Sequence, residues 1–435
     1  MVSIEIGKSY LDGNIKCPPS KSYTHRAIAI ASLTEGKSII SNPLLGRDTK
    51  ATIEGCKMLG VNIEKNNENF NSFVVNGMNQ FQTPKDVINA ENSGTTIRFL
   101  TSMAALVKYG YTIITGDDSL KTRPMFPLIS ALKQIGVEAL SSNMNGTAPL
   151  IIKGGGIRGG LVTIEGNISS QFISSLLISC IYANSEVEIR IQGRQVSIPY
   201  IISTTETMKK FGVIIDHDKE HSNYFISSNK YKRTNFTIPG DFSSASLIIA
   251  AGILTGRKIT INNINFNYPQ GDMKIIEIVK EMGGDIRIDS EKGELSVTGS
   301  DSLEGIDCNL INTPDLLPVV SIISLKAKSP MRIFGISHAR YKETDRVSNI
   351  TREIRKMGVN IIEKEDEIII NPSKFLKNAD LNSYNDHRLF MAFTIASMLT
   401  DKSVVRGAES IDVSYPSFLQ DIKSLGANVK VMHSN

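Results

Sequence analysis

The sequence predicts an α/β protein built from six copies of one unit, arranged as two lobes of three, and three observations support this fold class. A short phrase recurs six times, in which a basic residue and a large apolar residue precede glycine and a strand. An apolar helix recurs between those glycines. Proline residues interrupt the chain where the third unit meets the fourth. Self-similarity at a fixed spacing indicates repeated structural units.

Each glycine of the recurring phrase is expected to end a helix. Basic residues precede it, which suits the negative end of the helix dipole, and glycine tolerates the left-handed conformation that ends many helices. Alternating residues such as 61–64 follow, which is typical of a strand. The glycines are spaced by roughly 70 to 76 residues, a regular period for one structural unit. They are Gly60, Gly136, Gly212, Gly283, Gly358 and Gly426.

The apolar helices should begin at polar clusters rich in capping residues. The expected starts lie near Arg26, Thr95, Ser170, Ser244, Asp315 and His387. Capping alone is the first explanation for any single cluster. Lys21, Arg26, Arg98 and Arg388 add cations in or near the first turn, where a cation is unfavourable unless an anion lies beside it. The fourth start, residues 241–244, carries no cation and is expected only to cap. If several starts converge, they form a site for phosphates and carboxylates.

The boundary between the lobes is expected at the prolines. Pro239 follows the last strand of the third unit, and Pro18 and Pro19 follow an opening strand around residues 3–6. We expect an N-terminal lobe of residues 18–237 and a C-terminal lobe of residues 1–17 plus 238–435. The opening strand would then belong to the second lobe, and the two crossings near 17–19 and 237–240 would form a two-stranded hinge.

Composition limits the classes of function. Of the 435 residues, 41% are hydrophobic and 21% charged, and 48 basic against 44 acidic residues give a net charge of +4. This charge is too small and dispersed for a nucleic-acid surface, and aromatic residues amount to only 6%. The four cysteines lack disulfide or metal-ligand spacing, so no metal is expected. Without a secretory signal or a run long enough to span a membrane, a cytoplasmic protein with no membrane partner is expected.

The fifth unit contains the most charged cluster, which a solvated loop could also explain. It runs His338-Ala339-Arg340-Tyr341-Lys342-Glu343-Thr344-Asp345-Arg346. Together with Arg123, His387 and Arg388, this cluster supplies cations and carboxylates from several units.

These clusters resemble the motifs of the 5-enolpyruvylshikimate-3-phosphate synthase family from one end of the chain to the other. The motifs are Pro19-Ser20-Lys21-Ser22 through His25-Arg26, Asn92-Ser93-Gly94-Thr95, Ser169-Ser170-Gln171, Pro314-Asp315, Lys342-Glu343-Thr344-Asp345-Arg346 and Asn385-Asp386-His387-Arg388. The resemblance implies a two-lobed inside-out α/β barrel, with three copies of a β-α-β-α-β-β unit in each lobe. It also implies an enzyme of the shikimate pathway of aromatic amino-acid biosynthesis. Such an enzyme transfers the enolpyruvyl group of phosphoenolpyruvate to the 5-hydroxyl of shikimate 3-phosphate and releases phosphate.

The resemblance also assigns ligand-binding residues. For shikimate 3-phosphate it implies Lys21, Ser22, Arg26, Ser169, Ser170, Gln171, Ser197, Asp315, His338 and Lys342. For phosphoenolpyruvate it implies Lys21, Asn92, Gly94, Arg123, Gln171, Arg346 and Arg388. Guanidinium groups suit these ligands because they bind carboxylate and phosphate through paired hydrogen bonds. His387 is a further candidate without an assigned role.

The expected catalytic residues are Asp315, Glu343 and Lys21. Asp315 would take the proton of the 5-hydroxyl, and Glu343 would protonate the methylene carbon in an addition that is followed by elimination. A free glutamate has a pKa of about 4.3, so burial or substrate charge would have to raise the pKa of Glu343. The neighbouring Lys342 and Arg346 act in the opposite direction. We expect a monomer that uses no cofactor and closes its lobes on shikimate 3-phosphate.

Three positions depart from the family pattern, and two alternative functions stay open. Val413 stands where the family has a lysine, which leaves one phosphoenolpyruvate contact open, while His338 replaces an asparagine and Phe99 a proline. The nearest alternative is the enolpyruvyl transferase that acts on UDP-N-acetylglucosamine, whose reactive loop cysteine is not apparent here. The alternative from another class is a non-enzymatic nucleic-acid-binding repeat protein.

Overall fold

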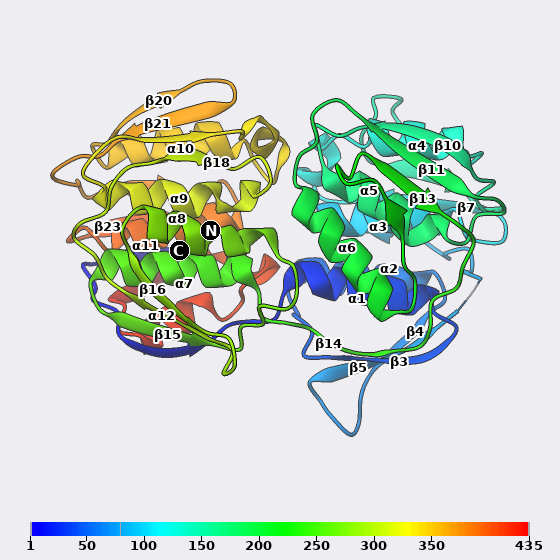
Figure 1. The fold of residues 1–435 in the computed structure, drawn as a ribbon, viewed down its shortest axis with the longest axis horizontal. Coiled ribbons are helices and arrows are strands. Elements are labelled where there is room, and N and C mark those ends of the chain that lie inside the picture. The colour runs from blue at the N-terminus through cyan, green and yellow to red at the C-terminus, as the bar shows by residue number, and fades with distance from the viewer. Residues whose placement is uncertain (1, 79, 434–435) are drawn as a thin grey trace. The chain divides into compact units, whose positions relative to one another are not determined.

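The computed structural model describes residues 2–78 and 80–433, and the chain forms two compact units (Figure 1). The N-terminal unit is Pro19–Pro239, and the C-terminal unit combines Met1–Pro18 with Gly240–Asn435. The chain therefore passes from one unit to the other at two places, each beside a proline. The use of these crossings as a hinge remains a prediction.

Within the described residues, each unit has three four-stranded sheets of one topology, in which the first two strands are parallel and the other neighbours antiparallel. In the N-terminal unit the first sheet contains β14 (Asn235–Thr237), β3 (Gly36–Ser41), β5 (Ser72–Gly77) and β4 (Asn62–Lys65). The second contains β6 (Ile88–Asn89), β7 (Tyr111–Thr115), β9 (Leu150–Lys153) and β8 (Ala139–Ser141). The third contains β10 (Gly160–Glu165), β11 (Val187–Gln192), β13 (Asn223–Ile226) and β12 (Asp216–His217).

The C-terminal unit repeats this topology with strands from both ends of the chain. Its first sheet contains β2 (Gly13–Lys16), β15 (Lys258–Asn262), β17 (Glu294–Thr298) and β16 (Asp285–Asp289). The second contains β18 (Asp307–Asn309), β19 (Met331–Phe334), β21 (Glu367–Asn371) and β20 (Asn360–Glu363). The third contains β22 (Asp380–Asn382), β23 (Ser403–Arg406), β1 (Val2–Ile6) and β24 (Val429–His433). In that last sheet, Ile4 of β1 lies opposite Val405 on one side and Val431 on the other.

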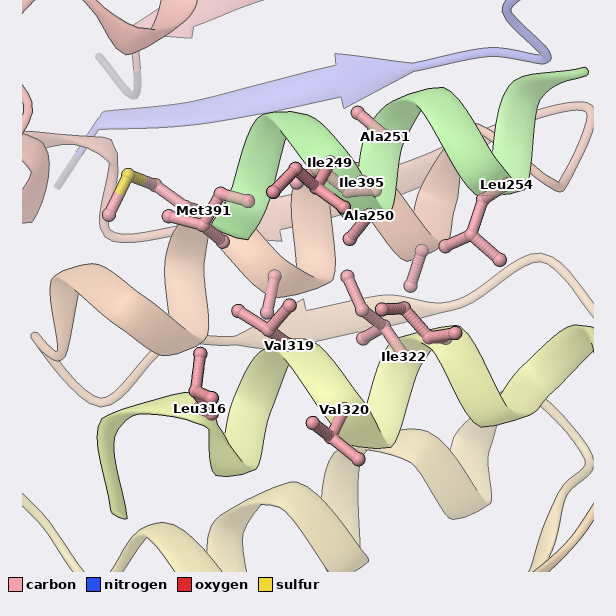
Figure 2. Close-up of a cluster of buried hydrophobic side chains, with 14 of the residues drawn as sticks. Ile249, Ala250, Ala251, Leu254, Leu316, Val319, Val320, Ile322, Met391 and Ile395 are labelled. Carbon is pink, nitrogen blue, oxygen red and sulfur yellow. The ribbon is translucent and has the colours of Figure 1, made fainter. Parts of the chain in front are cut away.

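Three buried helices form the interior of each unit. In the N-terminal unit these are α1 (Lys21–Leu33), α3 (Gly94–Ala104) and α5 (Ser170–Cys180). In the C-terminal unit they are α7 (Phe242–Thr255), α9 (Leu317–Ile323) and α11 (His387–Ser397), and every residue of these three is buried. Figure 2 shows Val319 and Ile322 of α9 pointing towards Ala250 and Leu254 of α7. The alanine lets the helices approach closely, and burial removes apolar surface from water.

The remaining helices are only partly buried. They are α2 (Arg47–Met58), α4 (Phe126–Gln134), α6 (Ile198–Lys210), α8 (Lys274–Glu281), α10 (Arg346–Lys356) and α12 (Phe418–Ser424). Short 3-10 helices connect these elements. They are η1 (Leu120–Thr122), η2 (Gly271–Met273), η3 (Pro314–Leu316), η4 (Ser324–Lys326), η5 (Ser337–Tyr341) and η6 (Ala408–Val413). Helices inside and sheets outside, in β-α-β-α-β-β order, confirm the predicted fold class.

The capping residues act as the sequence predicts at five of the six buried helices, whereas at the fifth expected start, residues 312–315, no side chain caps η3 or α9. The side chains that cap buried helices are Ser20 for α1, Ser93 for α3, Ser169 for α5, Asp241 for α7 and Asp386 for α11. One expected start is wrong, because α1 begins at Lys21 rather than near Arg26. Ser20 Oγ accepts the Tyr23 amide, so the helix forms directly after this cap and Arg26 lies inside it.

Two further groups of residues complete the description of the fold. The four cysteines are free and buried. Among the described residues, none of the helices has the length and apolar character that a membrane span requires.

All six glycines of the recurring phrase adopt the left-handed conformation, which confirms their predicted role. Their φ angles are 97° at Gly60, 83° at Gly136, 82° at Gly212, 87° at Gly283, 85° at Gly358 and 106° at Gly426. The partly buried helices end just before them, and an L side chain in this conformation strains the backbone.

Replacing Gly358 with alanine should lower the free energy of unfolding by about 1 to 2 kcal/mol. A Cβ at Gly358 would lie 3.4 Å from the flexible Lys377 side chain, so backbone strain, rather than a clash, is the expected cause. Urea denaturation would measure the effect. Gly358→Asn is the matched control and should be less destabilising, since asparagine tolerates this conformation. Equal stability of Gly358→Ala and the wild type would contradict the left-handed conformation assigned to residue 358.

Candidate functional site

The starts of four helices converge in the N-terminal unit. Asp48 of α2 joins two of them, because its Oδ2 lies 3.1 Å from Lys21 Nζ of α1 and its carbonyl accepts from Thr96 Oγ1 of α3 at 3.2 Å. The start of α5 joins through Gln171, whose Oε1 accepts from Arg98 Nη1. The predicted convergence of helix starts is therefore present within this unit. We call Lys21, Asn92, Gly94, Arg98, Arg123 and Gln171 the N-cluster.

Gly94 opens α3 beside two guanidinium groups. A Cβ there would lie 3.0 Å from Arg98 Nη1 and 3.2 Å from Arg123 Nη1, so any side chain would enter the space that they border. Asn92 Oδ1 accepts from Arg123 Nη2 at 2.7 Å, and Asn92 Nδ2 donates to Asp117 Oδ2 at 2.7 Å. Arg123 Nε is buried without a hydrogen-bond partner among the described residues. Two cations beside a bare helix start fit an anionic group.

Arg26 is buried in bonds to the protein itself. It is 2% exposed, and its Nε donates to Thr204 Oγ1 at 2.8 Å. Its Nη1 donates to the Ser22 carbonyl at 2.9 Å and its Nη2 to the Tyr200 carbonyl at 2.8 Å. Burial lowers the pKa of Arg26 to about 10, which leaves it charged at neutral pH. Arg26 therefore ties α1 to α6, and a substrate carboxylate would have to use the remaining Nη hydrogens or replace one of these acceptors.

Three serines lie at the starts of α5 and α6. Ser169 Oγ accepts from the Gln171 amide at 3.3 Å, and Ser170 is the first, buried residue of α5. Ser197 precedes α6 with φ of 60°, a conformation that costs a non-glycine residue energy and often marks functional sites. These hydroxyls and amides surround helix N-termini, where an anion is stabilised.

Arg346 is the centre of the cluster in the C-terminal unit. This side chain is 1% exposed and bonds three carboxylates: Asp315 Oδ1 at 2.7 Å, Glu343 Oε2 at 2.6 Å and Asp386 Oδ2 at 2.7 Å. Burial opposes its charge, but Asp386, Glu343 and Asp315 together raise the pKa of Arg346 above its ordinary value. We call Asp315, Lys342, Glu343, Arg346, Asp386 and Arg388 the C-cluster.

Asp315, the predicted base, contacts three cations. Besides Arg346, its carboxylate lies 3.0 Å from Arg388 Nη2 and 3.6 Å from Lys342 Nζ. Burial lowers the pKa of Lys342 below its ordinary value, although Asp315 opposes this effect. Substrate anions that bind these cations would therefore compete with Asp315 for them.

Glu343, the predicted acid, contacts Arg346 Nη2 through its Oε2 at 2.6 Å. Arg346 shares its charge with Asp315 and Asp386, which reduces the pull on Glu343. A bound anion at Arg346 would reduce that pull further.

The fourth helix start does more than cap, and the expectation for residues 241–244 was wrong in this respect. Asp241 Oδ2 caps α7 by accepting the Ser244 amide at 3.1 Å. The adjacent Ser243 Oγ accepts from Arg388 Nη2 at 3.2 Å and donates to Asp272 Oδ2. Sequence reasoning missed the roles of Ser243 and Asp272, because neither residue carries the positive charge that was sought at helix starts.

Three remaining candidates lie in the interior of the C-terminal unit. His338 is 3% exposed in η5, and His387 is fully buried as the first residue of α11. Val413 is 2% exposed at the end of η6, so an apolar side chain occupies the position where a family lysine was expected. Among the described residues, no three His, Cys, Asp or Glu side chains gather as a metal site.

Glu353 is a buried carboxylate that the sequence analysis did not identify. Its Oε2 accepts from the Asn382 amide at 2.8 Å and lies 2.6 Å from Lys356 Nζ, and its Oε1 accepts from the Tyr384 hydroxyl at 2.7 Å. Tyr384 and Asn385 both adopt positive φ angles, of 53° and 59°. Glu353 on α10 thus fixes the strained loop that leads into α11 and the C-cluster.

The fold and the two clusters define an α/β protein that holds cations at helix starts, as an enzyme that binds small, multiply charged anions does. A sequence model of EPSP synthase (3-phosphoshikimate 1-carboxyvinyltransferase) matches residues 6–422, so the chain belongs to the EPSP synthase family. A 3-phosphoshikimate 1-carboxyvinyltransferase of Methanocaldococcus jannaschii is 46% identical over 423 residues, 97% of each chain. The protein of that name from Methanococcus maripaludis is 42% identical over 427 residues, 97% of this chain and 98% of the relative. The structure of EPSP synthase from Acinetobacter baumannii has a TM-score of 0.82 at 25% identity and covers 100% of both chains.

Replacing Glu353 with alanine should lower the free energy of unfolding by about 3 kcal/mol, because buried donors lose their acceptor and Lys356 loses its counter-ion. Denaturant titration followed by circular dichroism would measure the change. Tyr384→Phe is the control that removes a single hydrogen bond, and its expected cost is about 1 kcal/mol. A loss from Glu353→Ala no larger than that of the control would show that the loop does not depend on this carboxylate.

Proposed function

We propose that this protein transfers the enolpyruvyl group of phosphoenolpyruvate to the 5-hydroxyl of shikimate 3-phosphate and releases phosphate, as a step of the shikimate pathway. The observation that carries the proposal is the family match over residues 6–422, with the family's motifs located at converging helix starts. Both substrates are phosphate- and carboxylate-bearing anions, which such helix starts stabilise. One chain supplies all the proposed residues, so we propose that it acts as a monomer.

For phosphoenolpyruvate, the proposed binding groups are chiefly guanidinium groups and helix-start amides. The residues are Lys21, Asn92, Gly94, Arg123, Gln171, Arg346 and Arg388. The space that a Cβ of Gly94 would fill, bordered by Arg98 and Arg123, supports the assignment of an anionic group to the start of α3. The buried Arg123 Nε, which has no partner among the described residues, supports it independently. Guanidinium groups hold carboxylate and phosphate with defined orientation, which the addition step requires.

For shikimate 3-phosphate, the proposed residues combine serine hydroxyls with cations. They are Lys21, Ser22, Arg26, Ser169, Ser170, Gln171, Ser197, Asp315, His338 and Lys342. The start of α5 supports a phosphate position at Ser169 and Ser170, since amides and a hydroxyl gather there. Arg26 is the weakest assignment, because its guanidinium already has three acceptors in the protein.

In the proposed mechanism the addition step forms a bond between the 5-oxygen of shikimate 3-phosphate and C2 of phosphoenolpyruvate. Asp315 takes the 5-hydroxyl proton, and Glu343 gives a proton to the C3 methylene, which becomes a methyl group. In the elimination step Glu343, now a carboxylate, takes a proton back from the methyl group, the C2–C3 double bond forms again and the C2–oxygen bond to phosphate breaks. The released phosphate carries away the proton that came from the 5-hydroxyl. Lys21 stabilises the departing phosphate. The Arg346 contacts support the roles of Asp315 and Glu343. Substrate anions that engage the cations would free Asp315 to act as a base and would favour protonation of Glu343.

UDP-N-acetylglucosamine is the competing acceptor. Burial raises the pKa of the Cys56 thiol and of the Cys180 thiol to about 12 each, so neither provides the reactive cysteine of that reaction. The names of the relatives also favour shikimate 3-phosphate. A nucleic-acid-binding role has no supporting observation.

Mixing the protein with shikimate 3-phosphate and phosphoenolpyruvate should release inorganic phosphate in a continuous assay. Omitting either substrate is the control and should abolish release. Turnover with UDP-N-acetylglucosamine in place of shikimate 3-phosphate, and none with the latter, would overturn the proposal.

Glu343→Gln should reduce kcat by about 100-fold or more, the usual contribution of a general acid, while both substrates still bind. The glutamine oxygen can still accept from Arg346, so the fold should survive. Initial rates and calorimetric binding of shikimate 3-phosphate would measure the two effects. Glu363→Gln is the matched control, because Glu363 is also bonded to an arginine, Arg340 at 2.9 Å, outside the C-cluster. Near-normal turnover of Glu343→Gln would exclude the proposed acid.

A further inference from the structure

The C-cluster and its neighbour Asp272 contain more carboxylates than cations. Arg346, Arg388 and Lys342 face the carboxylates of Asp315, Glu343, Asp386 and Asp272. The proposed substrates add further negative charge at the same cations. Besides the protonation of Glu343 in the proposed mechanism, binding of another anion in this cluster is favoured when a further carboxylate moves away or becomes neutral.

Asp272 is the carboxylate whose place in the fold suits neutralisation. It lies in η2 and is 3% exposed. Ser243 Oγ donates a hydrogen bond to Asp272 Oδ2 and accepts one from Arg388 Nη2 at 3.2 Å, so the serine links the carboxylate to the guanidinium. Arg388 Nη2 also lies 3.0 Å from Asp315 Oδ2. Arg388 is therefore shared between Asp315 and the Ser243–Asp272 pair.

The charged groups around Asp272 come from several elements. Asp241 lies at the start of α7, Asp315 in η3 and Arg388 in α11, while Lys274 of the adjoining α8 donates instead to the Asn309 carbonyl at 2.7 Å. Burial and the negative charge of Asp315 raise the pKa of Asp272 to about 6, against the opposing effects of Arg388 and the Ser243 hydrogen bond. A ligand anion that bound Arg388 would offset its positive charge and so raise the pKa of Asp272 further.

We propose that Asp272 is the exchangeable counter-ion of Arg388: it is paired through Ser243 in the ligand-free protein, and it takes up a proton when a substrate anion binds Arg388. The inference rests on the proposed function, in which Arg388 binds phosphoenolpyruvate. Asp272 is a positioning residue, because it acts on the substrate through Arg388 and Ser243. Protonation leaves the Ser243 bond possible while removing one negative charge from the neighbourhood of the ligand.

The sign of the pH dependence follows from linkage. If binding takes up a proton, affinity for phosphoenolpyruvate falls as pH rises above the pKa of Asp272 in the free protein, by up to about tenfold per pH unit. Below about pH 6 Asp272 is already protonated and the effect ends. Phosphate monoesters also titrate near pH 6, so the substrate contributes its own pH dependence. That contribution is the same for every variant and cancels in a ratio.

The test compares KM for phosphoenolpyruvate in the wild type and Asp272→Asn between pH 5.5 and about 8 in the full phosphate-release reaction. Asparagine has the shape of protonated Asp272, but its side chain does not titrate. The ratio of wild-type KM to variant KM should rise by at least about threefold between pH 6 and 8, while KM for shikimate 3-phosphate keeps a constant ratio. Asp301→Asn, which changes an exposed partner of Lys326, is the matched control and should show a constant ratio for both substrates.

Ser243→Ala gives a second test that keeps the carboxyl group. It should reduce the pH dependence of KM for phosphoenolpyruvate, because the link to Arg388 is lost, and it decides the question if Asp272→Asn fails to fold by circular dichroism. A constant ratio in a folded Asp272→Asn protein, or complete loss of its turnover, would overturn the role of Asp272 alone. Absence of phosphate release by the wild type would overturn the proposed function and this inference with it.

Discussion

The buried contact of Arg346 with three carboxylates is the interaction on which the C-terminal unit's site depends. Asp315 comes from η3, Asp386 caps α11, and Arg346 itself begins α10, so one guanidinium group joins three helix starts. The three carboxylates compensate the buried cation, and the cation compensates each buried carboxylate in turn. Loss of any member would leave an uncompensated charge in the interior. The same contacts that position the acidic side chains therefore hold the helix starts together.

The repeat and the helix ends could be predicted from the sequence because they depend on local chemistry. Six glycines end six helices in the left-handed conformation, and five polar side chains cap buried helices, since both properties follow from a residue and its immediate neighbours. The convergence of charged motifs within each unit followed from their recurrence at helix starts. The bonds of Arg26 to Thr204 and Tyr200 could not be predicted in this way, because they join residues that are distant in sequence. Glu353 was missed for the same reason, since Asn382 and Tyr384 lie on other elements, while Ser243 and Asp272 also lack the positive charge that was sought at helix starts.

The cations of both clusters have partners within the protein. Lys21 has the counter-ion Asp48 and Arg388 has Asp315, while Arg123 donates to the neutral side chain of Asn92. This arrangement keeps the cations stable without a ligand, but it also means that substrate binding is an exchange of partners rather than the filling of an empty positive site. The net binding energy is then the difference between two sets of charge-assisted hydrogen bonds. Small changes in the internal partners can therefore alter affinity, even when the cations themselves are unchanged.

The pairing of β1 with β23 and β24 places residues from the two ends of the chain in adjacent strands. During synthesis, the N-terminal unit can begin to fold once residues 19–239 have left the ribosome, because its sheets use only that continuous segment. The C-terminal unit cannot complete its sheets at that stage, because it combines two separate segments of the chain. Its strand β1 is made before the N-terminal unit, and its partners β23 and β24 are made only after that unit. The last sheet closes only when β24 has been made, so the C-terminal unit is completed after the N-terminal unit.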